Sequence, residues 1–289
     1  MILRLPHPSL LSATALLVGC APVRDGERDG KGQAPHALVR VDVQYQRVAN
    51  GEVTLDAQAY FIRYRGLDDS QVPTLLGFQG PRTIGTERCV SVDDKAALDR
   101  ALASRAATAE VELLDAGRLE LKAGDVRLPL DARHYPELVP GVVGTVYGGT
   151  GSLPAARVLG TAHTLGTDGS GEVSAFSVQA LTPSAFPDGK IERTTHGLRL
   201  RWTPIGDKLI DVELRPNGRR SARAIHCQLP DTLGSYVVPN AILAALGASL
   251  PDLQVTLRNR QKTLFDIPQL GRGELNLELR ETLRIGAVE

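Results

Sequence analysis

The chain has 289 residues, of which 42% are hydrophobic, 23% charged and 4% aromatic. This composition is typical of one or two globular domains and excludes a chain that is disordered throughout. Lys and Arg together number 33, as do Asp and Glu, so the formal net charge is zero. A neutral chain with few aromatic residues lacks both the charge and the stacking surface that nucleic acids require, so no nucleic-acid partner is expected.

Residues 1–19 are predicted to be a signal peptide. Arg4 supplies a positive charge, and residues 10–19 are apolar or small throughout. That stretch is too short to span a bilayer, but its length suits the apolar part of a secretory signal. The stretch ends in Leu17-Val18-Gly19, directly followed by Cys20.

Leu17-Val18-Gly19-Cys20 resembles the lipobox of bacterial lipoproteins. The resemblance implies cleavage before Cys20, diacylation of its thiol and acylation of its new amine. Three acyl chains would hold the protein firmly, because each buried CH₂ contributes about 0.8 kcal/mol. Ala21 follows the Cys, which in this family implies transport to the outer membrane of a two-membrane bacterium. The alternative is an ordinary secretory signal in which Cys20 has no role.

Residues 20–36 are predicted to be the lipidated Cys and a flexible tether. The stretch 21–36 mixes charges of both signs with Gly and Pro and has almost no apolar residue. Such a stretch cannot bury a core, so we expect it to act as a spacer. A partner-binding segment is the alternative.

From residue 37 the sequence predicts a mainly β fold, with two β-sandwich-like modules and a few short helices. Apolar residues alternate with polar ones before and after Asn50-Gly51, which predicts a β-hairpin. A two-residue loop would place Tyr45 opposite Asp56. A three-residue loop, 49–51, places Tyr45 opposite Leu55 and is therefore predicted, with Gly51 in the left-handed conformation.

Three short helices are expected between the strands. Asp68 and Gln71 resemble a capping box and predict one or two helical turns that end at Gly77. A second helix is predicted over 93–105, with Asp93 and Asp94 at its N-terminus. A third is predicted from Pro239 to Leu246, ended by Gly247.

We place the module boundary near residue 150, giving modules 37–150 and 151–289. Residues 131–155 are rich in Gly and Pro. The run Gly144–Gly151 lacks the Gly-Lys-Ser/Thr ending of a phosphate-binding loop and is interpreted as a hinge. Short alternating segments continue through the second module, which again favours a sandwich over repeated βαβ units.

The layout also resembles β-rich lipoproteins of myxobacteria. The residues that carry this resemblance are Tyr64-Arg65-Gly66-Leu67 and Asp231-x-x-Gly234-x-Tyr236-x-Val238-Pro239. It implies a β-rich fold and no particular activity.

Cys89 and Cys227 are the two cysteines that remain besides Cys20. In an oxidising compartment they could form a disulfide between the two modules. The alternative is two separately buried thiols, each packed as a small apolar group. Neither has the local sequence of a catalytic cysteine.

No familiar catalytic or metal-binding motif is present. Asp168-Gly169-Ser170-Gly171 has Asp where a nucleophile elbow needs Gly, and strand alternation follows it, so we predict a hairpin turn. The histidines of the mature chain lack the spacing of a metal site and are His36, His134, His163, His196 and His226. We therefore expect no catalytic residue, metal or cofactor.

Arg258, Arg260 and Lys262 occupy alternate positions of one predicted strand. Two interpretations remain open. They could lie on a solvated sheet face where they protect an edge, or they could contact an anionic ligand such as a polysaccharide or a lipid headgroup.

The prediction is a non-catalytic lipoprotein of the outer membrane, which binds an envelope protein or polysaccharide or takes part in envelope assembly. Two alternatives come from other classes. A periplasmic hydrolase would gather titratable side chains only in the fold, and a small-ligand carrier would contain a large apolar cavity.

Overall fold

The computed structural model describes residues 35–48, 51–69, 71–76, 88–103, 109–135, 142–206, 208–216, 223–247 and 253–285. The signal peptide, Cys20 and nearly all of the tether lie outside these residues. Within them the protein is mainly β with a few short helices, as predicted. None of the described helices has the length and apolar character needed to cross a membrane.

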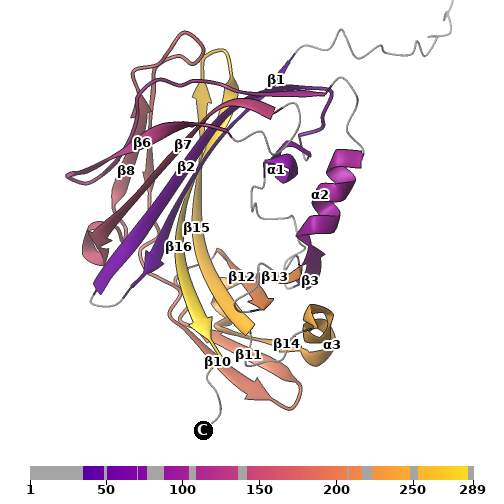
Figure 1. Ribbon diagram of the computed structural model, residues 1–289. Helices are drawn as coiled ribbons and strands as arrows, with labels where there is room; N and C mark the ends of the chain where they lie inside the picture. The colour runs from indigo at the N-terminus through magenta and orange to yellow at the C-terminus, as the bar shows by residue number, and fades with distance from the viewer. Residues whose placement is uncertain are drawn as a thin grey trace, which may run out of the picture. The chain divides into compact units, whose positions relative to one another are not determined.

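Most strands belong to one large sheet (Figure 1). In sheet order its strands are β3 (Arg88–Asp93), β13 (Arg223–Pro230), β12 (Leu209–Pro216), β15 (Leu253–Ile267), β16 (Gly271–Arg284), β1 (His36–Arg47), β2 (Glu52–Arg65), β4 (Glu110–Leu113), β7 (Val142–Pro154), β6 (Val126–His134), β5 (Leu119–Ala123), β8 (Ala162–Thr167) and β9 (Phe176–Leu181). A smaller sheet contains β10 (Gly189–Thr194), β11 (Gly197–Trp202) and β14 (Ser235–Pro239).

The β1–β2 hairpin has the predicted register. Tyr45 lies opposite Leu55, and Val43 lies opposite Ala57. The Val48 N–H donates to the Glu52 carbonyl at 3.1 Å, and Gly51 has φ +76°. Ala49 and Asn50 lie outside the described residues. The pairing of apolar with apolar residues therefore selects the three-residue loop.

The three short helices predicted from the sequence are present, together with two 3₁₀ turns that it did not indicate. These elements are α1 (Gln71–Leu75), α2 (Asp94–Ala103), α3 (Asn240–Leu243) and the 3₁₀ turns η2 (Ala155–Arg157), η3 (Asp231–Leu233) and η4 (Ala244–Leu246). The Asp68 N–H donates to Gln71 Oε1 at 2.8 Å, and Asp93 Oδ1 accepts from the Ala96 N–H at 3.0 Å. Gly247 ends η4 with φ +61°. Gly77, the predicted end of α1, lies outside the described residues.

Both ends of the β15–β16 hairpin contribute to hydrophobic cores on the same face of the large sheet. Odd-numbered residues of β15 and β16 carry the apolar side chains. Leu275, Leu277 and Leu279 belong to a first core with β1, β2, β5 and β8. Leu253, Val255 and Leu257 belong to a second core with the small sheet and α3. A third, smaller core packs α1 against β2 and β4.

The boundary expected near residue 150 falls inside a strand. Residue 150 belongs to β7, which pairs with β2 from Ala59↔Tyr147 to Glu52↔Pro154. The Gly-rich run is therefore not a hinge but part of a ladder. Its glycines allow close packing, since a Cβ on Gly149 would lie 2.9 Å from the Pro129 carbonyl oxygen. Beyond that point, β8 pairs with β5, so strands from the two expected modules share one sheet.

Gly144→Ala tests this interpretation of the Gly-rich run. Gly144 has φ +121°, and an added Cβ would lie 1.9 Å from the Leu113 carbonyl oxygen. We expect the free energy of unfolding to fall by at least about 2 kcal/mol, measured by urea denaturation.

Gly151→Ala is the matched control on the same strand. Its Cβ would make an ordinary contact, 3.6 Å from Leu128 Cδ1. We expect a change within about 1 kcal/mol. Equal and small effects of the two variants would contradict the close ladder at Gly144.

Candidate functional site

Along β12, β15 and β16, the face of the large sheet opposite the first and second cores is mostly polar, and it holds the basic residues predicted from the sequence. Arg258, Arg260 and Lys262 lie at even positions of β15, which pairs with β12 over residues 253–259 and with β16 along nearly its whole length. The side chains of Arg258 and Arg260 are only 7% and 12% exposed, whereas that of Lys262 is 47% exposed. Where Arg258 lies, β15 is an interior strand, so this part does not protect an edge.

Two buried glutamates neutralise these arginines. Glu213 on β12 accepts hydrogen bonds from Arg258 and Arg215. Glu278 on β16 accepts from Arg260 Nη2 at 2.5 Å and from Arg260 Nε at 3.0 Å.

Glu278 also links arginines of neighbouring strands. Its Oε1 accepts from Arg280 Nε and lies 3.7 Å from Arg258 Nε. We call Asp211, Glu213, Arg215, Arg258, Arg260, Glu278 and Arg280 the ionic cluster.

The strand register explains this arrangement. Arg260 lies directly opposite Glu278 on β16, which favours a direct pair. Arg258 lies opposite Arg280 on the same strand and opposite Asp211 on β12. Two like charges face each other at that point, and Glu278 offsets the repulsion because it contacts both arginines.

The electrostatics of the cluster hold its glutamates ionised. Burial would raise the pKa of Glu278, but Arg280, Arg258 and Arg260 outweigh this effect and lower it to about 2. Burial opposes ionisation of Glu213 too, yet Arg258 and Arg215 lower its pKa. For Asp211, burial exceeds the influence of Arg260, and the pKa is raised. The positive charges of Arg258 and Arg260 are therefore neutralised by carboxylates within the protein.

The hypothesis of an anionic contact at Arg258, Arg260 and Lys262 is not supported by this geometry. Arg258 and Arg260 are buried and paired, and Lys262 is paired with Glu274. A ligand anion would have to displace a carboxylate from a buried guanidinium. The sequence of β15 alone shows these basic residues but not their partners, because the carboxylates that neutralise them come from β12 and β16.

Beside the ionic cluster, the polar face contains an open hollow of about 550 Å³. We call it the polar hollow; its lining includes Gln44, Gln46, Thr54, Asp56, Thr150 and Arg280. Thr54, Asp56 and Thr150 are exposed. The hollow offers amide, hydroxyl and carboxylate groups, which suit hydrogen bonding to a polar partner. In the sequence, the only indication of this hollow was the set of polar residues that alternate with apolar ones in the predicted hairpin.

Ser170 and His163 both have structural contacts. Ser170 lies between β8 and β9 in a turn, as predicted, and its Oγ donates to the Asp115 carbonyl oxygen. His163 is buried in the first core, where its ring meets that of Tyr45 edge-on at 5.5 Å. Burial lowers the pKa of His163. Among the described residues, no group of three or more His, Cys, Asp or Glu could hold a metal ion.

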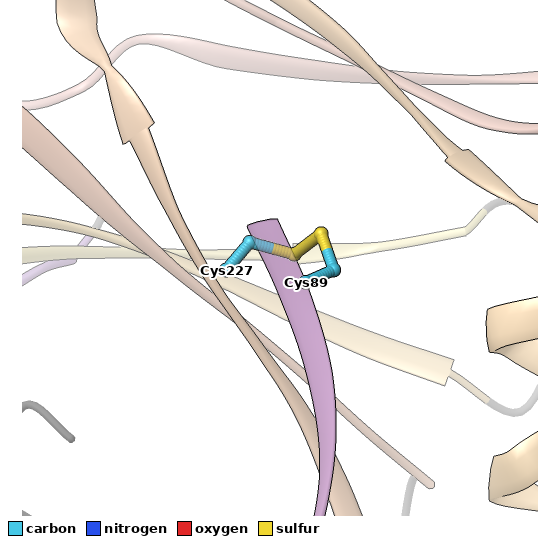
Figure 2. The surroundings of a disulfide bond; sticks show 2 residues. All are labelled: Cys89 and Cys227. Carbon is cyan, nitrogen blue, oxygen red and sulfur yellow. A yellow bond between two sulfur atoms is a disulfide. The ribbon is translucent and has the colours of Figure 1, made fainter. Parts of the chain in front are cut away.

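Cys89 and Cys227 form a disulfide (Figure 2). Cys89 lies on the edge strand β3 and Cys227 on β13, directly opposite each other. Cys227 is buried in the second core. Of the two states that the sequence left open, the structure therefore has the bonded one, and it attaches β3 covalently to the large sheet.

Comparisons with known proteins add little. The chain matches no protein-family model and no curated protein sequence. Among solved structures it is similar to the Fcho1 Mu homology domain of Danio rerio with bound Eps15 peptide, at 7% identity over 86% of this chain and 93% of that chain. The TM-score is 0.21, too low to carry any argument about fold or function.

Glu278→Gln should destabilise the protein strongly. It removes the negative charge shared by Arg258, Arg260 and Arg280 and leaves the four arginines of the ionic cluster with only two carboxylates. We expect a loss of about 3–5 kcal/mol in the free energy of unfolding, measured by urea denaturation at neutral pH.

Glu274→Gln, on the same strand, is the control, because Glu274 pairs with the half-exposed Lys262 and should contribute less than about 1 kcal/mol. The pH dependence gives a second check. Because the pKa of Glu278 is lowered from 4.5 to about 2, the wild-type protein should lose this stabilisation as pH falls through that range. Glu278→Gln should lack this loss; equal acid sensitivity of both proteins would argue against the cluster.

The disulfide should contribute about 5 kcal/mol in the chain-entropy model, because its cysteines are 138 residues apart. We expect the double variant Cys89→Ala, Cys227→Ala to lose about that much stability, and reduction of the wild-type protein to cause a similar loss. All these proteins would carry Cys20→Ser, so that Cys89 and Cys227 are the only cysteines of the reference protein. Two thiols that react in the denatured, unreduced protein would show that the bond is absent.

Proposed function

We propose that the protein is an exported lipoprotein of the outer membrane, anchored through Cys20, and that it acts by binding rather than by catalysis. The observation that carries the anchor is Leu17-Val18-Gly19-Cys20 at the end of a short apolar stretch that follows Arg4. A thiol at that position is the group that receives diacylglycerol in lipoproteins, and three acyl chains would hold the chain at a membrane.

The disulfide supports export. Disulfides persist outside the cytoplasm, where no thiol pool reduces them. Cys89 and Cys227 are bonded to each other, so neither takes up the Cys20 thiol that lipidation would use. The proposed tether of residues 21–36 would then hold the β-sheet protein at a distance from the membrane surface.

The polar hollow supports binding to an envelope polysaccharide or protein. Its exposed hydroxyl and carboxylate groups, with two half-buried glutamines beside them, provide donors and acceptors on a face formed by paired strands. Three carboxylates offset most of the charge of the four arginines in the neighbouring ionic cluster, and Arg280, which lines the hollow, is paired with Glu278. Recognition there would therefore depend on hydrogen bonds more than on charge.

The two alternatives receive less support. The interior of the first core is filled by large buried side chains such as Tyr45, Phe61 and Tyr147, which leaves little room for the cargo of a carrier. For a hydrolase, the buried carboxylates of the ionic cluster are engaged in ion pairs with arginines. Binding therefore remains the proposal.

Cys20→Ser tests the anchor. We expect cells that make the wild-type protein to incorporate radiolabelled palmitate into it and to retain it in the outer-membrane fraction. The Cys20→Ser protein should carry no label and should leave the envelope fraction, because a protein without acyl chains has no anchor to hold it there. A Cys20→Ser protein that fractionates with the envelope as before would overturn the proposal.

A further inference from the structure

A second, smaller pocket lies where β12 begins, on the side of the second core. Its volume is about 130 Å³, and its lining includes Ser184, Ile205, Lys208, Leu209, Asp231 and Asn259. This volume is several times the space of one water molecule and close to that of a roughly 150 Å³ cavity that holds a six-carbon ring. The pocket can therefore take more than a structural water.

The structure fixes Asp231 in this pocket by both its main chain and its side chain. Its N–H donates to the Lys208 carbonyl oxygen at 2.8 Å, and its carbonyl oxygen accepts from Trp202 Nε1 at 2.9 Å. Its Oδ2 accepts from the N–H groups of Ile205 at 2.5 Å and Gly206 at 2.8 Å. The carboxylate is therefore held in place before any ligand arrives.

The second carboxylate oxygen of Asp231 has no partner. Asp231 is only 6% exposed, and its Oδ1 is buried without a hydrogen bond. Within the part of the chain that the structure describes, no cation forms an ion pair with it. Lys208, which lines the same pocket, donates to Gln261 Oε1. A buried carboxylate oxygen without a donor or counter-charge is costly, so this atom indicates a site for one.

We propose that the pocket binds a primary alkylammonium group, such as the side chain of a lysine on a partner. The ammonium would donate to Asp231 Oδ1 and neutralise the carboxylate. The alkyl chain would lie against the apolar side chains of Ile205 and Leu209. A hydroxyl-bearing ligand would satisfy the oxygen but would leave the buried negative charge uncompensated, which is why the ammonium is favoured. This site does not depend on the anchor or on the polar hollow.

Trp202 provides a reporter for the test. It is the chain's only tryptophan, and its Nε1 donates to the main chain of Asp231. We would titrate the full chain, in detergent solution, with n-butylammonium chloride at constant ionic strength and follow its fluorescence. We expect a saturable change with a Kd of about 1–10 mM, in the range for so small a ligand. The neutral isostere 1-butanol, and the tetramethylammonium ion, which has no N–H to donate, should give no saturable change below about 100 mM.

Asp231→Asn is the central variant, because it removes the charge but keeps an oxygen that can accept from Ile205 and Gly206. We expect it to weaken butylammonium binding at least about tenfold. Lys208→Gln removes the protein's own ammonium from the lining, and it should leave binding unchanged or tighter. Leu209→Phe, at a position that is 39% exposed, should block the pocket even if Asp231→Asn folds poorly, and it keeps Trp202 as the only tryptophan.

Three results would overturn the inference. The first is the absence of saturable binding by n-butylammonium below about 100 mM, far above the expected Kd. The second is binding that Asp231→Asn and Leu209→Phe both leave intact. The third is saturable binding of a sugar such as glucose that depends on Asp231, while n-butylammonium has no effect.

Discussion

The alternation of side chains along the β15–β16 hairpin is the constraint on which the rest of the structure depends. These are two of the longest strands of the protein, and both cores use their odd-numbered residues. Figure 1 shows the pair beside β1 at one end and beside β12 at the other. Because successive side chains point to opposite faces, the even-numbered residues of both strands must lie together on the other face. A one-residue slip would bury the charges and expose the leucines.

The ionic cluster follows from that constraint. Once Arg258 and Arg260 are placed on an interior strand, they must be paired, because an unpaired buried guanidinium costs several kcal/mol. Glu213 and Glu278 come from the strands on either side, so the pairs also tie β12, β15 and β16 in one register. Such pairs are a weak source of stability compared with an apolar replacement, and their role is better described as specifying the register. The polar hollow beside them remains available to a partner.

Local features could be predicted from the sequence, and long-range ones could not. The Tyr45–Leu55 register, the capping side chains of Asp68, Gln71 and Asp93, and the turn at Ser170 depend on residues close in sequence. By contrast, β1 pairs in parallel with β16, so that Val39 lies opposite Gly273, and no local pattern indicates this. The partners of Arg258, Glu213 and Glu278, are also distant in the sequence, so no local pattern indicates them. The hinge predicted at Gly144–Gly151 was wrong because glycine is typical both of a hinge and of a close approach between strands, and only the neighbouring strands distinguish the two. Asp231 was noted only within a loose motif, since its free oxygen is a property of the folded pocket.

Because β15 and β16 contribute side chains to both the first and the second core, these two cores should unfold as one cooperative unit. The most direct test is urea unfolding followed by two probes in the same samples. Fluorescence of Trp202 reports the second core, and hydrogen exchange of β1 and β2 amides reports the first. We expect the same midpoint and the same slope for both probes. Two separate transitions, with Trp202 exposed while β1 and β2 stay protected or the reverse, would contradict it and would restore two independent modules.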